Sequence, residues 1–252
     1  MPSLPFPPNI STQAAAAQKA GKFDAEIVPV ETYVLTGEDG KTKERIVVTA
    51  DDGIRPGTSA SGLSKLKPAF KKGGSTTAGN ASQTTDGAAA VMLMRRDEAR
   101  RRHLPILGIF RSAAVVGVDP LVMGIGPAVA IPAALDRAGL TTQDVDVYEL
   151  NEAFASQATY CADVLRLDAA KINPNGGAIA LGHPLGATGA RQVATLLHEM
   201  ARRGNDARFG VVSMCIGSGM GMAAVFEGGG SRDDLRNAEP ELHHPHLSRD
   251  AR

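Results

Sequence analysis

The feature that most constrains the fold is an alternation of strand-like and helix-like segments between residues 85 and 227. Apolar runs of the kind found in buried strands occupy positions 106–116, 145–150, 209–216 and 221–227. Segments with helical periodicity or helix-boundary residues lie at 97–103, 127–138, 152–165 and 187–203. Strands interleaved with helices predict an α/β fold in which helices cover a sheet.

The first 84 residues follow a different pattern. An Ala- and Gln-rich run at 11–20 predicts a short helix that ends at a glycine. Two β-rich runs at 25–34 and 45–49, with a turn at 38–41, predict a hairpin. Residues 51–84 are rich in Gly, Pro, Ser and Lys and show little periodicity, which is typical of a functional loop region.

Two further segments bear on the boundaries of the fold. Residues 87–94 predict a buried apolar segment, for which the pattern does not separate strand from helix. The tail at 228–252 has mixed charges and no apolar period, which predicts disorder. Because no rigid frame would position its His243, His244 and His246, no metal site is predicted there.

Composition excludes several classes of protein. The chain has 252 residues, with 27 basic and 27 acidic ones, so wholesale binding to nucleic acid or an anionic membrane is not expected. Its 2 cysteines are too few for a disulfide framework and fit a reducing compartment. Gly, Pro or charge interrupts each apolar run before it reaches membrane-spanning length, and the first residues lack the features of a secretory signal. We therefore expect a soluble, intracellular protein.

Three polar residues follow apolar runs and could form one reactive site. Cys215 ends such a run and is followed by glycines, which let backbone amides approach a ligand closely. Asn151 and His183 occupy similar positions, and the three together are typical of Cys/His acyl transfer. The alternatives are a buried small cysteine, a core histidine, and an asparagine that caps the helix beginning at Glu152. Glu152 itself could simply favour the start of that helix.

Four stretches of the chain, in this order, resemble the signatures of the thiolase family, particularly its peroxisomal 3-ketoacyl-CoA type. They lie at residues 77–82, 151–154, 175–184 and 215–221. The resemblance implies an α/β fold, the thiolase-like layered αβαβα sandwich, of which this chain would be the second half only, with the end of a CoA-binding loop domain. The divisions implied are a flexible N-terminal remnant, a partial loop domain, a thiolase C-terminal domain and a disordered tail, at 1–22, 23–84, 85–227 and 228–252.

The resemblance also implies roles for single residues. His183 would take the proton from a nucleophilic thiol, and Cys215 would protonate the enolate of acetyl-CoA. Asn151 would hold a water that forms one oxyanion hole with His183, and the backbone amide of Gly217 would contribute to a second. In the family the nucleophilic cysteine belongs to the first half. No cysteine precedes Cys161 here, and Cys161 itself is expected to pack in the core.

For the substrate, the resemblance implies weaker assignments. Arg55 would lie near the nucleotide end of CoA and Ser82 near the pantetheine. The alternatives are a surface arginine and a turn serine. Four lysines could add attraction for the anionic substrate or simply be solvated: Lys65, Lys67, Lys71 and Lys72.

The function implied is thiolytic cleavage of 3-ketoacyl-CoA to acetyl-CoA and a shortened acyl-CoA, in fatty acid β-oxidation, with CoA and acyl-CoA as substrates and no permanently bound cofactor. This chain would be inactive alone, because it lacks the nucleophile. A non-catalytic CoA-binding or dimer-forming module is the alternative. The family further implies a homo-oligomer for the complete member and a peroxisomal location, although no targeting signal is visible here.

Overall fold

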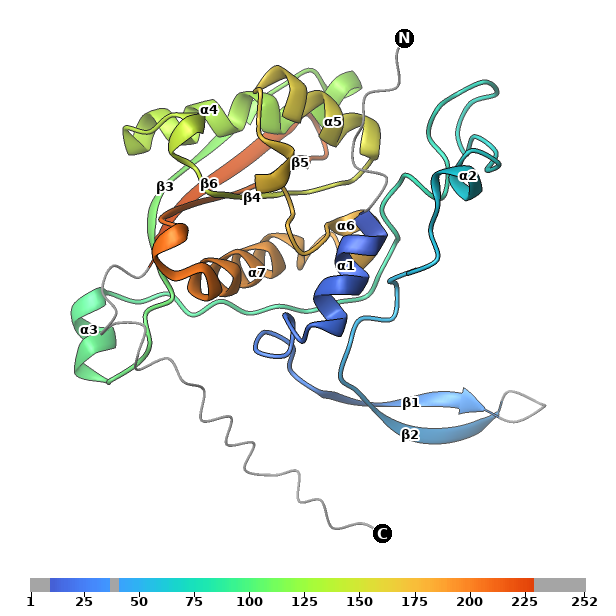
Figure 1. Cartoon of the computed structure of the whole chain (residues 1–252), viewed down its shortest axis with the longest axis horizontal. Helices are drawn as coiled ribbons and strands as arrows, with labels where there is room; N and C mark the ends of the chain where they lie inside the picture. Colours follow the sequence, from blue (N-terminus) through green and yellow to red (C-terminus); the bar gives the residue numbers. More distant parts are fainter. Residues whose placement is uncertain (1–9, 37–40, 229–252) are drawn as a thin grey trace.

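The computed structural model describes residues 10–36 and 41–228 of the chain. Its centre is a mixed four-stranded sheet in the order β3-β6-β5-β4 (Figure 1). These strands are β3 (Gly108–Gly117), β6 (Met220–Gly228), β5 (Phe209–Ile216) and β4 (Val147–Leu150). β6 runs antiparallel to both of its neighbours, whereas β4 and β5 run parallel. The predicted strands are therefore confirmed, with small shifts of their ends.

Helices cover both faces of this sheet. On one face lie α4 (Gly126–Ala138) and α5 (Ala155–Val164), and on the other lies α7 (Thr188–Arg203) (Figure 1). Ile131 and Leu135 of α4 are buried in a cluster with Val211 of β5. Leu196 and Met200 of α7 are buried in a second cluster. The chain thus forms an α/β/α unit with a core on each side of the sheet, as the alternation predicts.

Short helical turns connect these elements. The α-helices α2 (Ala60–Leu63) and α6 (Ala178–Leu181) are one turn long, and α3 (Arg96–Arg101) is only slightly longer. The 3₁₀ turns are η1 (Pro120–Ile125), η2 (Thr142–Asp144), η3 (Ala169–Lys171) and η4 (Gly204–Asp206). Thr141 caps η2, because its side chain and backbone both bond Asp144.

The N-terminal part lies beside this unit. The described part of the expected flexible remnant is a packed helix: α1 (Ile10–Lys19) lies against α6 and buries Ala14 and Ala17. Strands β1 (Val30–Thr36) and β2 (Thr42–Val48) form the expected antiparallel hairpin, which extends away from the layers (Figure 1). Most of the predicted turn at 38–41, the tail and its three histidines lie outside the described residues.

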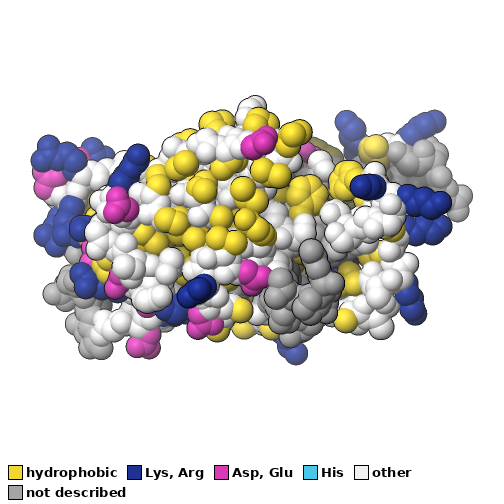
Figure 2. Space-filling model, turned by 90° about the horizontal axis from the view of Figure 1, so that it is seen from above, with side chains coloured by type: hydrophobic (Ala, Val, Ile, Leu, Met, Phe, Trp, Pro, Cys, Tyr) yellow, Lys and Arg dark blue, Asp and Glu magenta, His cyan; other side chains and the backbone are white. Residues whose placement is uncertain are grey.

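The prediction for residues 87–94 is wrong. This segment is neither strand nor helix, and most of it is exposed; Met92 and Leu93 have 79% and 75% of their surface open to solvent. Within the described residues no strand pairs with it, so its apolar side chains have no sheet to pack into. The space-filling view shows that other apolar side chains also gather on one exposed face (Figure 2).

The expectation about apolar runs also needs correction. The stretch Pro120–Ala138, which joins η1 to α4, is 19 residues long with a mean hydropathy of 1.3, and by length and composition alone it could cross a membrane. In the structure its Ala130, Ile131 and Ala134 are fully buried. Helix α4 therefore covers one face of the sheet. A buried helix of this kind can match a membrane-spanning helix in length and composition.

Candidate active site

Two of the predicted site residues follow neighbouring parallel strands at the same edge of the sheet. Leu150, the last residue of β4, lies opposite Ser213 of β5. The next backbone amide, that of Asn151, donates to the Ser213 carbonyl over 2.9 Å. Cys215 comes two residues further along β5. The carboxyl ends of β4 and β5 therefore bring Asn151 and Cys215 to one edge, as is usual for sites on α/β sheets.

His183 reaches this edge from the loop between α6 and α7. Its Nε2 lies 3.3 Å from Nδ2 of Asn151, and its Nδ1 lies 2.6 Å from Oγ1 of Thr188. Its backbone amide is held by the Gln83 carbonyl and by the Thr85 hydroxyl, at 3.1 and 3.0 Å. Loss of solvation lowers the pKa of His183, and the nearby positive charge of Arg191 lowers it further. At neutral pH the imidazole is thus neutral and able to accept a proton.

Asn151 is fully buried, and only some of its polar atoms have hydrogen-bond partners. Its carbonyl accepts from Nε2 of Gln157 at 3.2 Å, but its side-chain Oδ1 has no partner. Asn151 is not a helix cap, because α5 begins four residues later with Phe154 at the N-cap. A buried polar atom without a partner is costly and is typical of a place where a ligand or water completes the bonding.

The structure gives Glu152 a structural task. Its carboxylate accepts from Asn173 Nδ2 at 2.6 Å and from the Ile179 backbone amide at 3.2 Å. It therefore ties the end of β4 to the loop that leads to His183. Burial raises the pKa of Glu152 to about 7.

Sequence reasoning missed a second buried carboxylate nearby. Glu149 of β4 is almost fully buried and pairs with Arg191 of α7 at 3.0 Å, yet burial raises its pKa to about 8. The sequence does contain one indication of this carboxylate, because Glu149 is the charged residue of the short apolar run that forms β4. Thr188 was missed as well, since the sequence does not show that it would contact His183.

The loop after Cys215 is open. A Cβ built on Gly217 would meet nothing within 4 Å, and Ser218 and Gly219 have positive φ values of 70° and 93°. Cys215 is partly buried, and burial raises the pKa of its thiol. Cys161, as expected, is fully buried in the core below, where burial raises its pKa to about 11.

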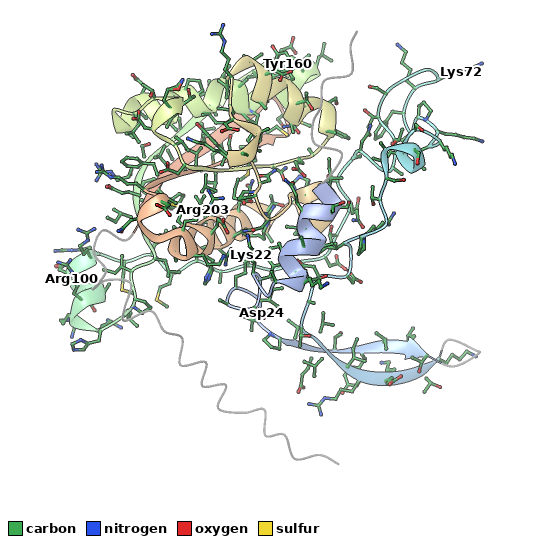
Figure 3. The ribbon with its side chains drawn as sticks, viewed as in Figure 1. Lys22, Asp24, Lys72, Arg100, Tyr160 and Arg203 are labelled. Carbon is green, nitrogen blue, oxygen red and sulfur yellow. The ribbon has the colours of Figure 1, made fainter. Side chains whose placement is uncertain are left out.

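The structure places Ser82 next to the site and Arg55 further out. The Ser82 amide donates to the Ala153 carbonyl at 2.9 Å, so the loop region runs along the segment that follows β4. Gln83 Nε2 donates to the Gly53 carbonyl at 3.1 Å, which holds the stretch before Arg55 nearby. Arg55 is exposed, as are the four lysines. Figure 3 shows Lys72 at the outer end of the loop region.

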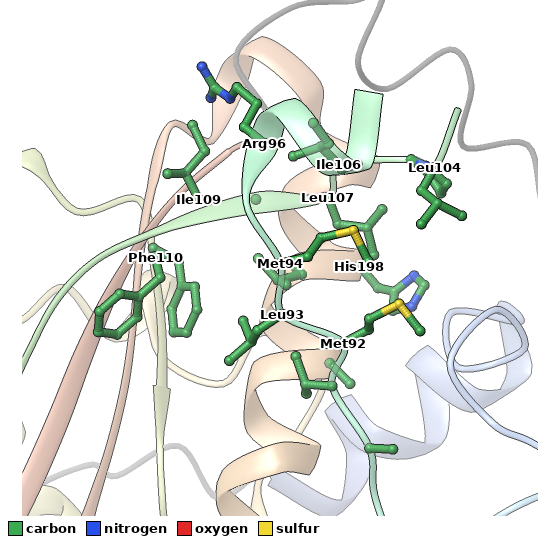
Figure 4. Close-up of a pocket in the computed structure, with 18 residues that line it drawn as sticks. Met92, Leu93, Met94, Arg96, Leu104, Ile106, Leu107, Ile109, Phe110 and His198 are labelled. Atoms are coloured by element: carbon green, nitrogen blue, oxygen red, sulfur yellow. The ribbon is translucent and has the colours of Figure 1, made fainter. Parts of the chain in front are cut away.

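Among the described residues, two hollows can be placed near these elements. The smaller one borders His183 and is lined by residues 85–89 and 184–187. The larger, about 490 Å³, is an apolar groove between residues 90–94, β3 and α7, with Met92, Leu93 and His198 among its lining (Figure 4). Neither His183 nor Cys215 lines the larger groove, so it is separate from the candidate site.

Comparison with known proteins agrees with this geometry. The family model described as the thiolase C-terminal domain matches residues 104–228, and the thiolase N-terminal domain model matches residues 9–97. The chain is 63% identical over 244 residues to a Petunia hybrida protein named 3-ketoacyl CoA thiolase 1, peroxisomal, covering 97% of this chain and 53% of that protein. It is 65% identical over 215 residues to the human peroxisomal 3-ketoacyl-CoA thiolase, covering 85% of this chain and 50% of that protein.

Solved structures give the same result. The dimeric peroxisomal thiolase of Saccharomyces cerevisiae matches with a TM-score of 0.78 and 49% identity, over 88% of this chain and 53% of that chain. Human mitochondrial 3-ketoacyl-CoA thiolase in complex with CoA matches with a TM-score of 0.77 and 40% identity, over 88% and 53%. The chain thus spans about half the length of the curated relatives it matches.

Proposed function

The chain belongs to the thiolase family, and from this premise we propose that it supplies the acid–base and oxyanion-binding part of a site that cleaves 3-ketoacyl-CoA with CoA. The observation that carries the proposal is the contact between His183 and Asn151, 3.3 Å apart at the sheet edge that Cys215 also reaches. The reaction belongs to fatty acid β-oxidation.

His183 acts first as a base. Its Nε2 takes the proton of a cysteine thiol, and the thiolate sulfur forms a bond to the 3-keto carbon of the substrate. The bond between C2 and C3 then breaks, and its electron pair passes to the enolate of acetyl-CoA. The thiol of Cys215 donates a proton to C2 of that enolate. A thiol of raised pKa is protonated at neutral pH, which suits this role.

CoA completes the cycle. Its thiol gives its proton to the Cys215 thiolate, and its sulfur attacks the acyl-cysteine, which releases the shortened acyl-CoA. The cysteine thiolate that leaves takes its proton back from His183. Each oxyanion formed on the way needs donors. His183 and a water held by the unpartnered Oδ1 of Asn151 would form one set of donors to an oxyanion. The backbone amide of Gly217, in an open loop, would contribute to a second set.

The nucleophilic cysteine is proposed to lie outside these 252 residues. The chain's 2 cysteines are Cys161 and Cys215. Cys161 is fully buried under the sheet and cannot meet a substrate. Since the chain spans about half of its relatives' length, a separate segment has room to supply the thiol. We therefore expect no turnover by the chain alone.

The substrate would lie along the loop region, with Ser82 near the pantetheine and Arg55 near the nucleotide. No bound cofactor is required, because CoA and acyl-CoA are substrates. The domain divisions at residues 22, 84 and 227 stay proposals: β1 begins at Val30, the next element after residue 84 is α3 at Arg96, and β6 ends at Gly228. The relatives' names, peroxisomal and in one case dimeric, support a peroxisomal location and a homo-oligomer for the complete protein.

Complementation tests this function. Thiolysis of a 3-ketoacyl-CoA is measured with the purified chain, alone and after co-expression with the part of the Petunia hybrida relative that this chain does not span. We expect activity only in the co-expressed pair, and loss of it in His183→Ala and Cys215→Ala. Activity of the chain alone would contradict the proposed absence of the nucleophile. An inactive pair that still binds CoA would favour the non-catalytic CoA-binding module instead.

A further inference from the structure

We infer that Thr188 is a positioning residue that fixes the tautomer of His183, with the proton on Nδ1, so that Nε2 is the nitrogen that exchanges protons in the site. The role of Nε2 in proton exchange rests on the proposed function, whereas the tautomer is inferred from contacts that do not depend on any activity. Thr188 is the first residue of α7 and is 1% exposed, and its hydroxyl lies 2.6 Å from His183 Nδ1.

The direction of the hydrogen bonds follows from a second contact. Thr188 Oγ1 also lies 3.0 Å from the Pro184 carbonyl oxygen, which can only accept. A threonine hydroxyl carries one proton. If that proton is donated to Pro184, the hydroxyl oxygen accepts from His183, and Nδ1 must carry a proton. The opposite tautomer would leave two oxygen acceptors facing each other without a proton between them.

The far side of the ring is consistent with this assignment. With Nδ1 protonated, the neutral ring has its lone pair on Nε2, which accepts from Nδ2 of Asn151 at 3.3 Å. The chain of donors then runs in one direction, from Asn151 through His183 and Thr188 to Pro184. The same order keeps Nε2 basic and aimed at the edge where Cys215 lies.

Local structure explains how threonine comes to do this. The Thr188 backbone amide donates to the same Pro184 carbonyl at 2.9 Å, so the turn from Pro184 into α7 holds the side chain against the ring. One turn further along α7, Arg191 pairs with Glu149, which anchors the start of the helix to β4. Thr188 thus links the position of α7 to the orientation of His183.

The test is the ¹⁵N spectrum of the histidine-labelled chain without substrate, recorded by solid-state NMR on sedimented protein, which tolerates self-association. His183→Asn identifies the signals of His183. At a pH above the His183 pKa we expect a protonated Nδ1 and an unprotonated Nε2. In Thr188→Val the ratio of the two tautomers should fall by about fivefold, the effect of one ordinary hydrogen bond. Thr188→Ser keeps the hydroxyl and should restore the original ratio.

Thr195→Val is the matched control, because Thr195 is equally buried in α7 but bonds Glu26 rather than a histidine. It should leave the His183 signals unchanged. A protonated Nε2 in the unaltered chain, no change in Thr188→Val, failure of the serine to restore the ratio, or an equal shift in Thr195→Val would overturn the inference. A failed complementation assay would overturn only the proposed function, since these spectra need no turnover.

Discussion

The carboxyl group of Glu152 occupies the space that a side chain at Gly177 would need. A Cβ built on Gly177 would overlap the Glu152 carboxyl carbon and both of its oxygens. Glu152 in turn bonds Asn173 and the Ile179 amide. The glycine and the carboxylate therefore fit each other, and together they set the path of the loop that carries His183.

Gly177→Ala should accordingly destabilise the chain by about 1–3 kcal/mol, the usual cost of overpacking a closed site. Gly186→Ala is its control, since a Cβ there would meet nothing within 4 Å. The midpoint of urea unfolding measures both. Equal midpoints for the two variants would show that Glu152 can move aside at little cost.

Asn151→Ala should lower kcat of the complemented enzyme by about 100- to 1,000-fold, the effect of losing one oxyanion donor. The reason is that Asn151 contacts His183 through Nδ2, and its unpartnered Oδ1 would hold the water that donates to the oxyanion. Steady-state thiolysis kinetics measure the effect, with the exposed Asn205→Ala as control. An unchanged kcat would remove Asn151 from the proposed site.

Stability should fall as the pH rises from about 5 to 8. Burial raises the pKa of Glu26 and of Glu152 to about 7 each, so the folded chain keeps these protons. The unfolded chain releases these protons at about pH 4.3, which is the pKa of a glutamate in model peptides. A raised folded pKa gives stability that is fully present below the unfolded pKa and is lost as the pH rises through the folded pKa.

Glu26→Gln, which resembles the protonated acid, should reduce this pH dependence, because Glu26 Oε2 is buried without a partner. Urea unfolding at pH 5 and pH 8 measures the change. The exposed Glu44→Gln serves as control and should keep the full dependence. A midpoint that rises with pH in the unaltered chain would contradict the assignment of these protons.

The chain alone should self-associate, because Met92 and Leu93, which line the groove of Figure 4, leave an apolar strip exposed there. Met92→Lys with Leu93→Lys should shift the chain toward monomer in sedimentation velocity. Leu121→Lys changes a side chain that is 91% exposed outside this groove and should leave association unchanged. A monomeric unaltered chain would refute the prediction.

Much of the site could be expected from local pattern. His183, Asn151 and Cys215 each follow an apolar run and belong to stretches that resemble the family, so their identity required no structure. Their partners could not be found in this way. In the sequence, Thr188 and Arg191 look like any other residues of an amphipathic helix. Only the packing of α7 on the sheet brings Thr188 to His183 and Arg191 to Glu149.

The sequence by itself determined the elements of the α/β unit, because periodicity and helix-stopping residues act over a few neighbours. It failed at residues 87–94, since apolar content predicts burial only if another surface covers the segment, and no described strand pairs with it. Only the tertiary structure decided which polar groups meet. Asn151 and His183 stand 32 positions apart, and their contact depends on where Glu152 ties the intervening loop. The register of β4 with β5 decides that Cys215 lies at the same edge.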